Sequence, residues 1–180
     1  MGSPFLVPVA ALRRDIPSSS TVSFEAPFDA DAEFSPRPAG EGDVPAGAVV
    51  HVDVRLASFS GGISVRGRVT CPWVGRCRRC SRDVAGTVDV TVDERFVEAT
   101  RADDEAYRYE GDTIDLAPLV HDAVFLELPL TPLCRDTCRG LCVQCGIDLN
   151  DDTCECPAPV DPRWAKLTEL RFDEDSSESR

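Results

Sequence analysis

Apolar and polar residues alternate strictly in the middle of the chain, and a period of two is typical of β-strands with one buried face. The first alternating run consists of Val50, Val52, Val54 and Leu56, separated by His51, Asp53 and Arg55. After a turn at Ser60-Gly61-Gly62, a second run carries Ile63, Val65, Gly67 and Val69. Residues 49–70 therefore predict an antiparallel hairpin, and the valines of residues 84–92 predict a third strand beside it.

A helical period replaces this alternation after Asp115, whose carboxylate can cap free backbone N–H groups. Its apolar stripe consists of Leu116, Leu119, Val120, Ala123, Val124 and Leu126, and Pro129 ends it. We expect this helix to cover the apolar face of the sheet. A second, short helix is predicted from Asp161-Pro162, with Trp164, Leu167 and Leu170 on its apolar face. The predicted fold class is α+β, an antiparallel β-sheet covered by a helix, with a C-terminal Cys-rich zinc-binding module.

The predicted organisation has four parts along the 180 residues. These are an N-terminal strand and loop region (1–47), the β-sheet plus covering helix (48–130), the zinc-binding module with the C-terminal helix (131–171), and a disordered acidic tail (172–180).

Nine cysteines are present, and six of them crowd between Cys134 and Cys156. In a reducing compartment such a cluster favours a metal site over disulfides. Cys142-x2-Cys145-Gly146 is the most informative part, because two thiolates three positions apart in a tight turn can face one ion. The predicted ligands of a structural Zn²⁺ are Cys134, Cys138, Cys142 and Cys145, with Cys154 and Cys156 as alternates. Free or disulfide-linked cysteines and a catalytic zinc are the alternatives.

A further pair, Cys77-x2-Cys80, lies between two predicted strands. It would form a second metal half-site, share the C-terminal metal, or simply occupy the tip of a hairpin. A thioredoxin-like redox pair is disfavoured, since such a pair normally opens a helix.

The charge distribution is uneven. A formal net charge of -13 argues against a protein whose whole surface coats nucleic acid. Residues 66–82 nevertheless hold six arginines and no acid, and guanidinium groups pair with phosphate and stack on bases. The candidate RNA-binding residues are Arg66, Arg68, Trp73, Arg76, Arg78, Arg79 and Arg82. The alternative is internal neutralisation by the acidic stretch 93–122, which we interpret as a solvated loop.

Several functions are not supported by the composition. No segment approaches the roughly 20 apolar residues that span a bilayer, so we expect a cytoplasmic protein without a membrane partner. The two histidines, His51 and His121, fit a strand surface and a helix surface. A metal-dependent nuclease or hydrolase would need a constellation of histidines and carboxylates that the cysteine segment lacks. We therefore predict neither an enzyme nor a small-molecule substrate.

The cysteine segment with its flanks resembles the YceD-like family, called large ribosomal RNA subunit accumulation proteins. The resemblance rests on residues 134–150, Cys154-Glu155-Cys156 and Asp161-Pro162-Arg163-Trp164, together with residues 115–130 and Cys77-Arg78-Arg79-Cys80. It covers roughly residues 48–171. Val143 departs from the family pattern, in which proline is common at this position of the turn.

The resemblance implies a non-enzymatic role in ribosome biogenesis, in the synthesis or accumulation of large-subunit ribosomal RNA, with no catalytic residues. The implied partner is that RNA or a pre-ribosomal particle, touched by the arginine-rich stretch. The alternative is an acidic adaptor for a basic ribosomal protein without direct RNA contact, which would use residues 103–105.

Overall fold

The structure is a computed structural model that describes residues 3–28, 42–99, 106–157 and 163. The chain divides into two compact units, Met1–Cys138 and Arg139–Arg180. The domain boundaries and the helix expected from Asp161 stay predictions, and that helix lies outside the described residues.

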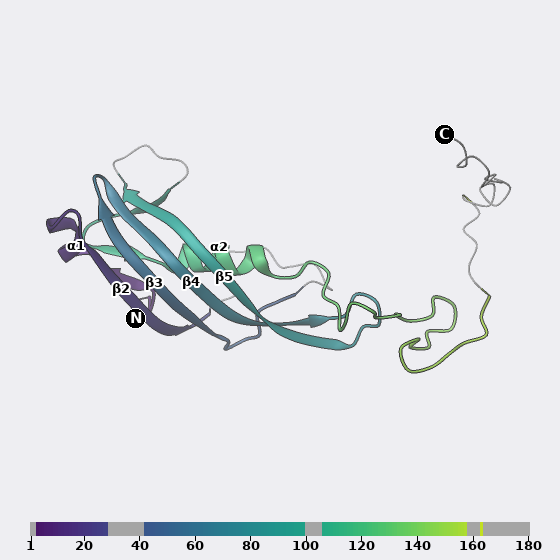
Figure 1. Ribbon diagram of the computed structural model, residues 1–180. Helices are drawn as coiled ribbons and strands as arrows, with labels where there is room; N and C mark the ends of the chain where they lie inside the picture. The colour runs from purple at the N-terminus through teal and green to yellow at the C-terminus, as the bar shows by residue number, and fades with distance from the viewer. Residues whose placement is uncertain (1–2, 29–41, 100–105, 158–162, 164–180) are drawn as a thin grey trace, which may run out of the picture. The chain divides into compact units, whose positions relative to one another are not determined.

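The first unit is built on a five-stranded sheet with the order β2-β3-β4-β5-β6 (Figure 1). Its strands are β2 (Ser19–Pro27), β3 (Val49–Phe59), β4 (Gly62–Arg76), β5 (Asp83–Glu98) and β6 (Tyr107–Tyr109). The first four are antiparallel neighbours, whereas the short β6 runs parallel to the end of β5. A small second sheet pairs β1 (Leu6–Pro8) with β7 (Thr113–Asp115), and a short helix α1 (Ala10–Arg14) follows β1.

The predicted hairpin is confirmed by the pairing of β3 with β4, whose alternating side chains are buried and exposed in turn. Gly67 is required in β4, because a Cβ there would lie 2.1 Å from the backbone oxygen of Asp53. The third strand is longer than predicted. Asp93 and Glu94, assigned to a solvated loop, lie within β5, so that part of the loop prediction was wrong. The strand continues through these acids because the buried Val92 and Phe96 maintain the alternation.

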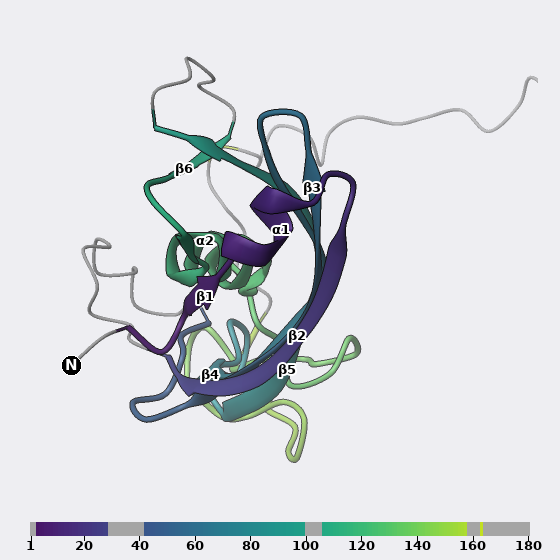
Figure 2. The ribbon, with the colours of Figure 1, turned by 90° about the vertical axis from the view of Figure 1, so that its left-hand side faces the viewer.

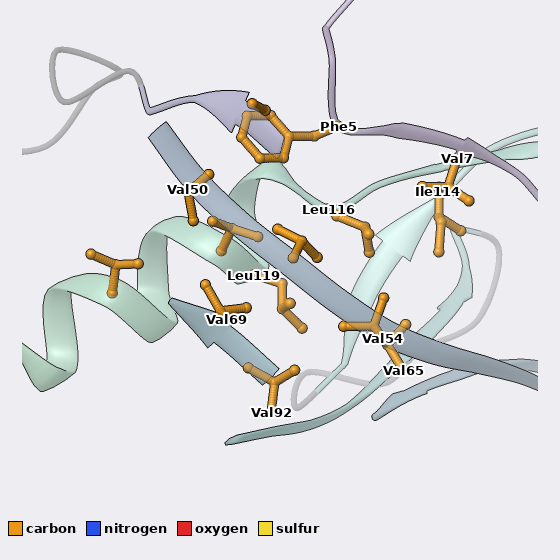
Figure 3. Packing of buried hydrophobic residues seen from close by; sticks show 14 of the residues in the cluster. Phe5, Val7, Val50, Val54, Val65, Val69, Val92, Ile114, Leu116 and Leu119 are labelled. Carbon is orange, nitrogen blue, oxygen red and sulfur yellow. The ribbon is translucent and has the colours of Figure 1, made fainter. Parts of the chain in front are cut away.

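The helix α2 (Ala117–Glu127) lies on the concave side of the curved sheet (Figure 2). As predicted, it starts beside Asp115, whose carboxylate accepts a 2.9 Å hydrogen bond from the N–H of Ala117. Its apolar side packs against valines of the sheet, as Figure 3 shows around Leu119, Val69 and Val92. The prediction that Leu126 belongs to this buried stripe was wrong, because Leu126 is 84% exposed. Burial of each large apolar side chain in this core contributes roughly 1.5–3 kcal/mol.

His121 was predicted on the helix surface, which is wrong. It is 4% exposed, and its ring stacks on Phe28 with the centroids 4.5 Å apart. Phe28 follows β2 and covers a side of α2 that the helical period alone leaves to solvent. His51 is exposed on β3, as predicted. Within the described ranges, no helix is long and apolar enough to span a membrane.

Candidate metal centres

The tip of the β4–β5 hairpin is a tight turn formed by Cys77-Arg78-Arg79-Cys80. The N–H of Ser81 donates to the carbonyl of Cys77 at 2.8 Å, and the N–H of Cys77 donates to the carbonyl of Arg82 at 2.8 Å. Ser81 closes the turn with a φ of 59°, a left-handed conformation that few non-glycine residues adopt. The hairpin thus ends in a turn that presents two thiols on one side.

Cys134 and Cys138, which follow α2, complete a group of four thiols at this tip. The Sγ atoms of Cys77 and Cys138 are 3.7 Å apart, those of Cys80 and Cys134 are 3.6 Å apart, and all four lie within 4.8 Å of one another. A tetrahedral zinc with bonds of about 2.3 Å needs sulfur atoms about 3.8 Å apart. A disulfide requires about 2.05 Å, and all cysteines are free. The four side chains therefore fit one tetrahedral ion.

Backbone and arginine contacts hold the two cysteine segments together. The N–H of Arg78 donates to the carbonyl of Pro132 at 2.8 Å. The guanidinium of Arg79 donates to the carbonyls of Asp136 at 3.2 Å and of Cys138 at 2.9 Å. Three of the four cysteines are buried, with Cys77 only 2% exposed, and Val84 packs against them.

The second unit contains a turn with the same backbone pattern, formed by Cys142-Val143-Gln144-Cys145-Gly146. The N–H of Gly146 donates to the carbonyl of Cys142 at 2.9 Å, and the N–H of Cys142 donates to the carbonyl of Ile147 at 2.8 Å. Gly146 has a φ of 74°, which is left-handed like the φ of 59° of Ser81 in the first turn. Cys154 and Cys156 complete this group, whose Sγ atoms also lie within 4.8 Å of one another.

The first thiol of each turn has a lowered pKa. Burial opposes ionisation of Cys77, but hydrogen bonds from the backbone N–H groups of Cys134, Cys80 and Arg79 outweigh it and lower the pKa of Cys77 to about 6. Backbone N–H groups of Cys145 and Gln144 likewise lower the pKa of Cys142 to about 6.

The last thiols to ionise behave in the opposite way. Burial, with a hydrogen bond that the Cys134 thiol donates to the Cys80 sulfur, raises the pKa of Cys134 to about 12. A hydrogen bond with Cys145, followed by burial, raises the pKa of Cys156 to about 12. Four thiolates at such spacing repel one another, so a fully ionised group requires a bound cation.

The structure divides the ligand set predicted from the sequence between two groups. Cys134 and Cys138 lie with Cys77 and Cys80, whereas Cys142 and Cys145 lie with Cys154 and Cys156. The ninth cysteine, Cys71, is buried on the core face of β4, and burial raises its pKa to about 11. Sequence reasoning recognised both C-x2-C turns and considered Cys77 and Cys80 as a second half-site. It did not assign to each turn its own second pair of thiols, Cys134 with Cys138 and Cys154 with Cys156.

Three of the arginines predicted for RNA binding form ion pairs with β5. Arg66 Nε lies 2.7 Å from Asp93, Arg68 Nη1 lies 3.0 Å from Asp89, and Arg76 Nε lies 3.5 Å from Asp83. These pairs are exposed, so each contributes about 0–1 kcal/mol to stability. They nevertheless balance much of the positive charge that the sequence suggested for the strand part of the basic stretch.

The remaining candidates lie toward the hairpin tip. The half-buried Trp73 covers Gly86 of β5, where an added Cβ would lie 2.8 Å from the indole ring. The guanidinium of Arg79 donates hydrogen bonds to the carbonyls of Asp136 and Cys138 beside the first thiol group. The side chains of Arg78 and Arg82 are exposed in the turn.

The part of the chain that contains both thiol groups matches a known protein family. The family described as large ribosomal RNA subunit accumulation protein YceD matches residues 65–171, which contain both groups and make up more than half of the chain. No solved structure matches the chain significantly.

Three relatives illustrate the range of similarity. An uncharacterized protein of Mycobacterium tuberculosis is 43% identical over 130 residues, which cover 69% of this chain and 63% of that protein. An uncharacterized protein of Bacillus subtilis is 28% identical over 130 residues, covering 69% of this chain and 73% of that protein.

The third relative, from Arabidopsis thaliana, is named large ribosomal RNA subunit accumulation protein YCED homolog 1, chloroplastic. It is 40% identical over 43 residues, which cover 24% of this chain and 13% of that protein. The chain thus spans less than two thirds of the mycobacterial relative and a small part of the plant one. From the match over residues 65–171, the chain belongs to the YceD family of large ribosomal RNA subunit accumulation proteins.

Proposed function

We propose that this protein is a non-enzymatic ribosome biogenesis factor that supports the accumulation of large-subunit ribosomal RNA. The observation that carries the proposal is the family match over residues 65–171, together with the name of the plant relative. Its partner is that RNA or a precursor particle containing it. Eight thiols in two close groups need a reducing compartment to bind metal, which favours the cytoplasm.

The proposal includes one structural zinc in each thiol group. The first is held by Cys77, Cys80, Cys134 and Cys138, and the second by Cys142, Cys145, Cys154 and Cys156. The sulfur spacing and the all-thiolate donor sets support zinc, which accepts four soft ligands tetrahedrally. Four protein ligands leave no open position for water or substrate, so each zinc would supply cohesion and no chemistry.

Direct RNA contact is proposed at the first turn and not on the strands. Arg78 is exposed there, and within the described residues its guanidinium forms no ion pair. The outer face of the sheet is a poorer candidate because Arg66 and Arg68 are paired with carboxylates. Arg79 positions the cysteine segments of the first thiol group. Loss of RNA binding after its substitution could therefore come from a lost RNA contact or from a disturbed thiol group.

Depletion of the protein in its own organism tests the role. We expect the ratio of large- to small-subunit ribosomal RNA to fall at least about twofold, and a plasmid copy to restore it. A Cys77→Ser/Cys142→Ser copy is expected to fail, whereas a Cys71→Ala copy, which leaves both thiol groups intact, is expected to succeed. An unchanged ratio after depletion would contradict the proposed role.

A second experiment separates RNA contact from protein contact. Arg78→Glu is expected to abolish cross-linking to large-subunit RNA, while Arg14→Glu, an equal charge change on exposed α1, leaves it intact. If Arg78→Glu cross-links normally, the proposed RNA contact is wrong. Salt-sensitive capture of a basic ribosomal protein after nuclease treatment would then support the adaptor alternative.

A further inference from the structure

A groove runs along the first unit between β5 and α2. It has a volume of about 190 Å³ and is bordered by residues 90–94 of β5, by Tyr107 and by one side of α2. Its apolar lining includes Val92 and Leu119, which belong to the core, and Leu126, which is 84% exposed. The exposed leucine and the apolar groove beside it form one continuous surface, which offers a partner apolar area to bury.

The strand that borders the groove has a free edge. β5 pairs with β4 from Asp83 to Val97, but its other edge pairs with β6 only at Phe96–Glu98. Within the described ranges, the edge between Asp83 and Arg95 has no strand partner. The outward N–H and C=O groups of such an edge can accept an added strand.

The rim of the groove is acidic. Glu94, Asp122 and Glu127 border it, and Asp122 accepts a 2.7 Å hydrogen bond from the hydroxyl of Tyr107. Burial, together with Asp122, raises the pKa of Tyr107, so the phenol stays a hydrogen-bond donor and adds no charge. Glu94 and Glu127 form no ion pair within the described residues, in contrast to Asp93, which is paired with Arg66.

The geometry points to a binding site for an extended, basic segment of a partner protein. The segment adds to the free edge of β5 as a strand, its arginine or lysine side chains meet Glu94 and Glu127, and its apolar side chains cover Leu126. Nucleic acid does not fit, because its phosphates would face three carboxylates. This inference stands apart from the proposed function, since it needs neither zinc nor ribosomal RNA.

The test uses the full chain and a synthetic peptide of about seven residues, Arg-Thr-Val-Thr-Arg-Thr-Val, whose arginines and valines share one face of the extended strand, so that both kinds meet the groove. At about 3.4 Å per residue it is long enough for the bordering strand segment. Fluorescence anisotropy measures binding. We expect Glu94→Lys/Glu127→Lys to weaken it at least about tenfold, because two attractive charge contacts become repulsive. The control Glu25→Lys/Asp53→Lys makes the same charge change on the exposed outer face and is expected to have less than about a twofold effect.

A second probe tests strand addition without altering the protein. The same peptide with N-methyl groups on alternate residues keeps its charges but loses backbone donors, and we expect its binding to fall below detection. Amide NMR signals of residues 88–95 should shift with the parent peptide only. Equal binding of the two peptides, or equal binding by the Glu94→Lys/Glu127→Lys variant, would overturn the inference. Displacement of the peptide by an RNA oligonucleotide that shifts the same amides would overturn it as well.

Discussion

The two thiol groups share a backbone turn and differ in almost everything around it. In both turns the carbonyl of the first cysteine accepts a hydrogen bond from the N–H four residues later, and its N–H donates to the carbonyl five residues later. A residue with a left-handed φ follows the second cysteine. The turn at Cys77 extends a sheet with a large apolar core. Among the described residues 139–157, by contrast, no apolar side chain is buried.

The two groups also differ in charge. Residues 76–82 and 134–138 contain five arginines and one aspartate, whereas residues 139–157 contain four acids and one arginine. Zinc with four thiolates carries a net charge of about −2 and is stabilised by positive neighbours. Under the proposed zinc binding, the turn of the first unit cross-links two segments of a domain that already has an apolar core. The same turn in the second unit takes part in a metal site that stabilises the fold in place of such a core.

The largest expected effect is loss of all structure in the second unit on Cys142→Ser. Because no apolar side chain is buried in residues 139–157, we expect them to depend on the proposed metal for their folding free energy. Zinc content measured by elemental analysis should fall from two per chain to one. Amide NMR signals of residues 139–157 should collapse to random-coil positions while those of β3–β5 stay. Persistent dispersion in this unit would show that cohesion comes from elsewhere.

Cys77→Ser should produce a smaller effect, because the sheet remains. Cys80 and Cys134 are 54 positions apart, and releasing a cross-link of that length costs about 4 kcal/mol in chain entropy. We expect urea unfolding, followed by Trp73 fluorescence in a Trp164→Phe background, to show this loss with the sheet still folded in water. Cys71→Ala in the same background is the control with both thiol groups intact, and a loss as large as that of Cys77→Ser in this control would contradict the assignment.

The charge difference predicts the order of metal release. A chelator should remove zinc from the second group at least about tenfold faster than from the first, equivalent to ~1.4 kcal/mol. Added salt should narrow this gap because it screens exposed charges. Asp151→Asn/Asp152→Asn should slow release from the second group, whereas Asp53→Asn should not. Equal rates of zinc release from both groups would contradict the prediction that neighbouring charges set the order of release.

The smallest effects concern the residue that closes each turn. Gly146→Ala should weaken zinc binding by the second group by about 1–2 kcal/mol. The cause is the φ of 74° and not a steric clash, because nothing lies within 4 Å of an added Cβ. Ser81→Gly should stabilise the first turn by up to about 1 kcal/mol through relief of the same strain. Zinc competition titrations measure the first change, and urea unfolding measures the second. Opposite signs would show that the φ values do not limit these turns.

Local patterns were sufficient for much of the fold. The alternation from Val50 to Leu56 predicted β3, and the turn at Gly61 predicted its partner β4. Asp115 and Pro129 bracket α2 closely, since a capping carboxylate and a missing N–H act within one helical turn. The turn at Cys142 was likewise recognisable, because its spacing and its glycine are local requirements.

What the sequence by itself determined is thus local: strand faces, helix ends and the two C-x2-C turns. The tertiary structure alone decided which cysteines meet, because the segment after α2 returns to the tip of the β4–β5 hairpin and places Cys138 beside Cys77, 61 positions away. It also decided that His121 is buried under Phe28 and that the arginines of β4 meet aspartates of β5. Such contacts depend on strand register and sheet curvature, which are set by the packing of the whole core and are not encoded in any short spacing.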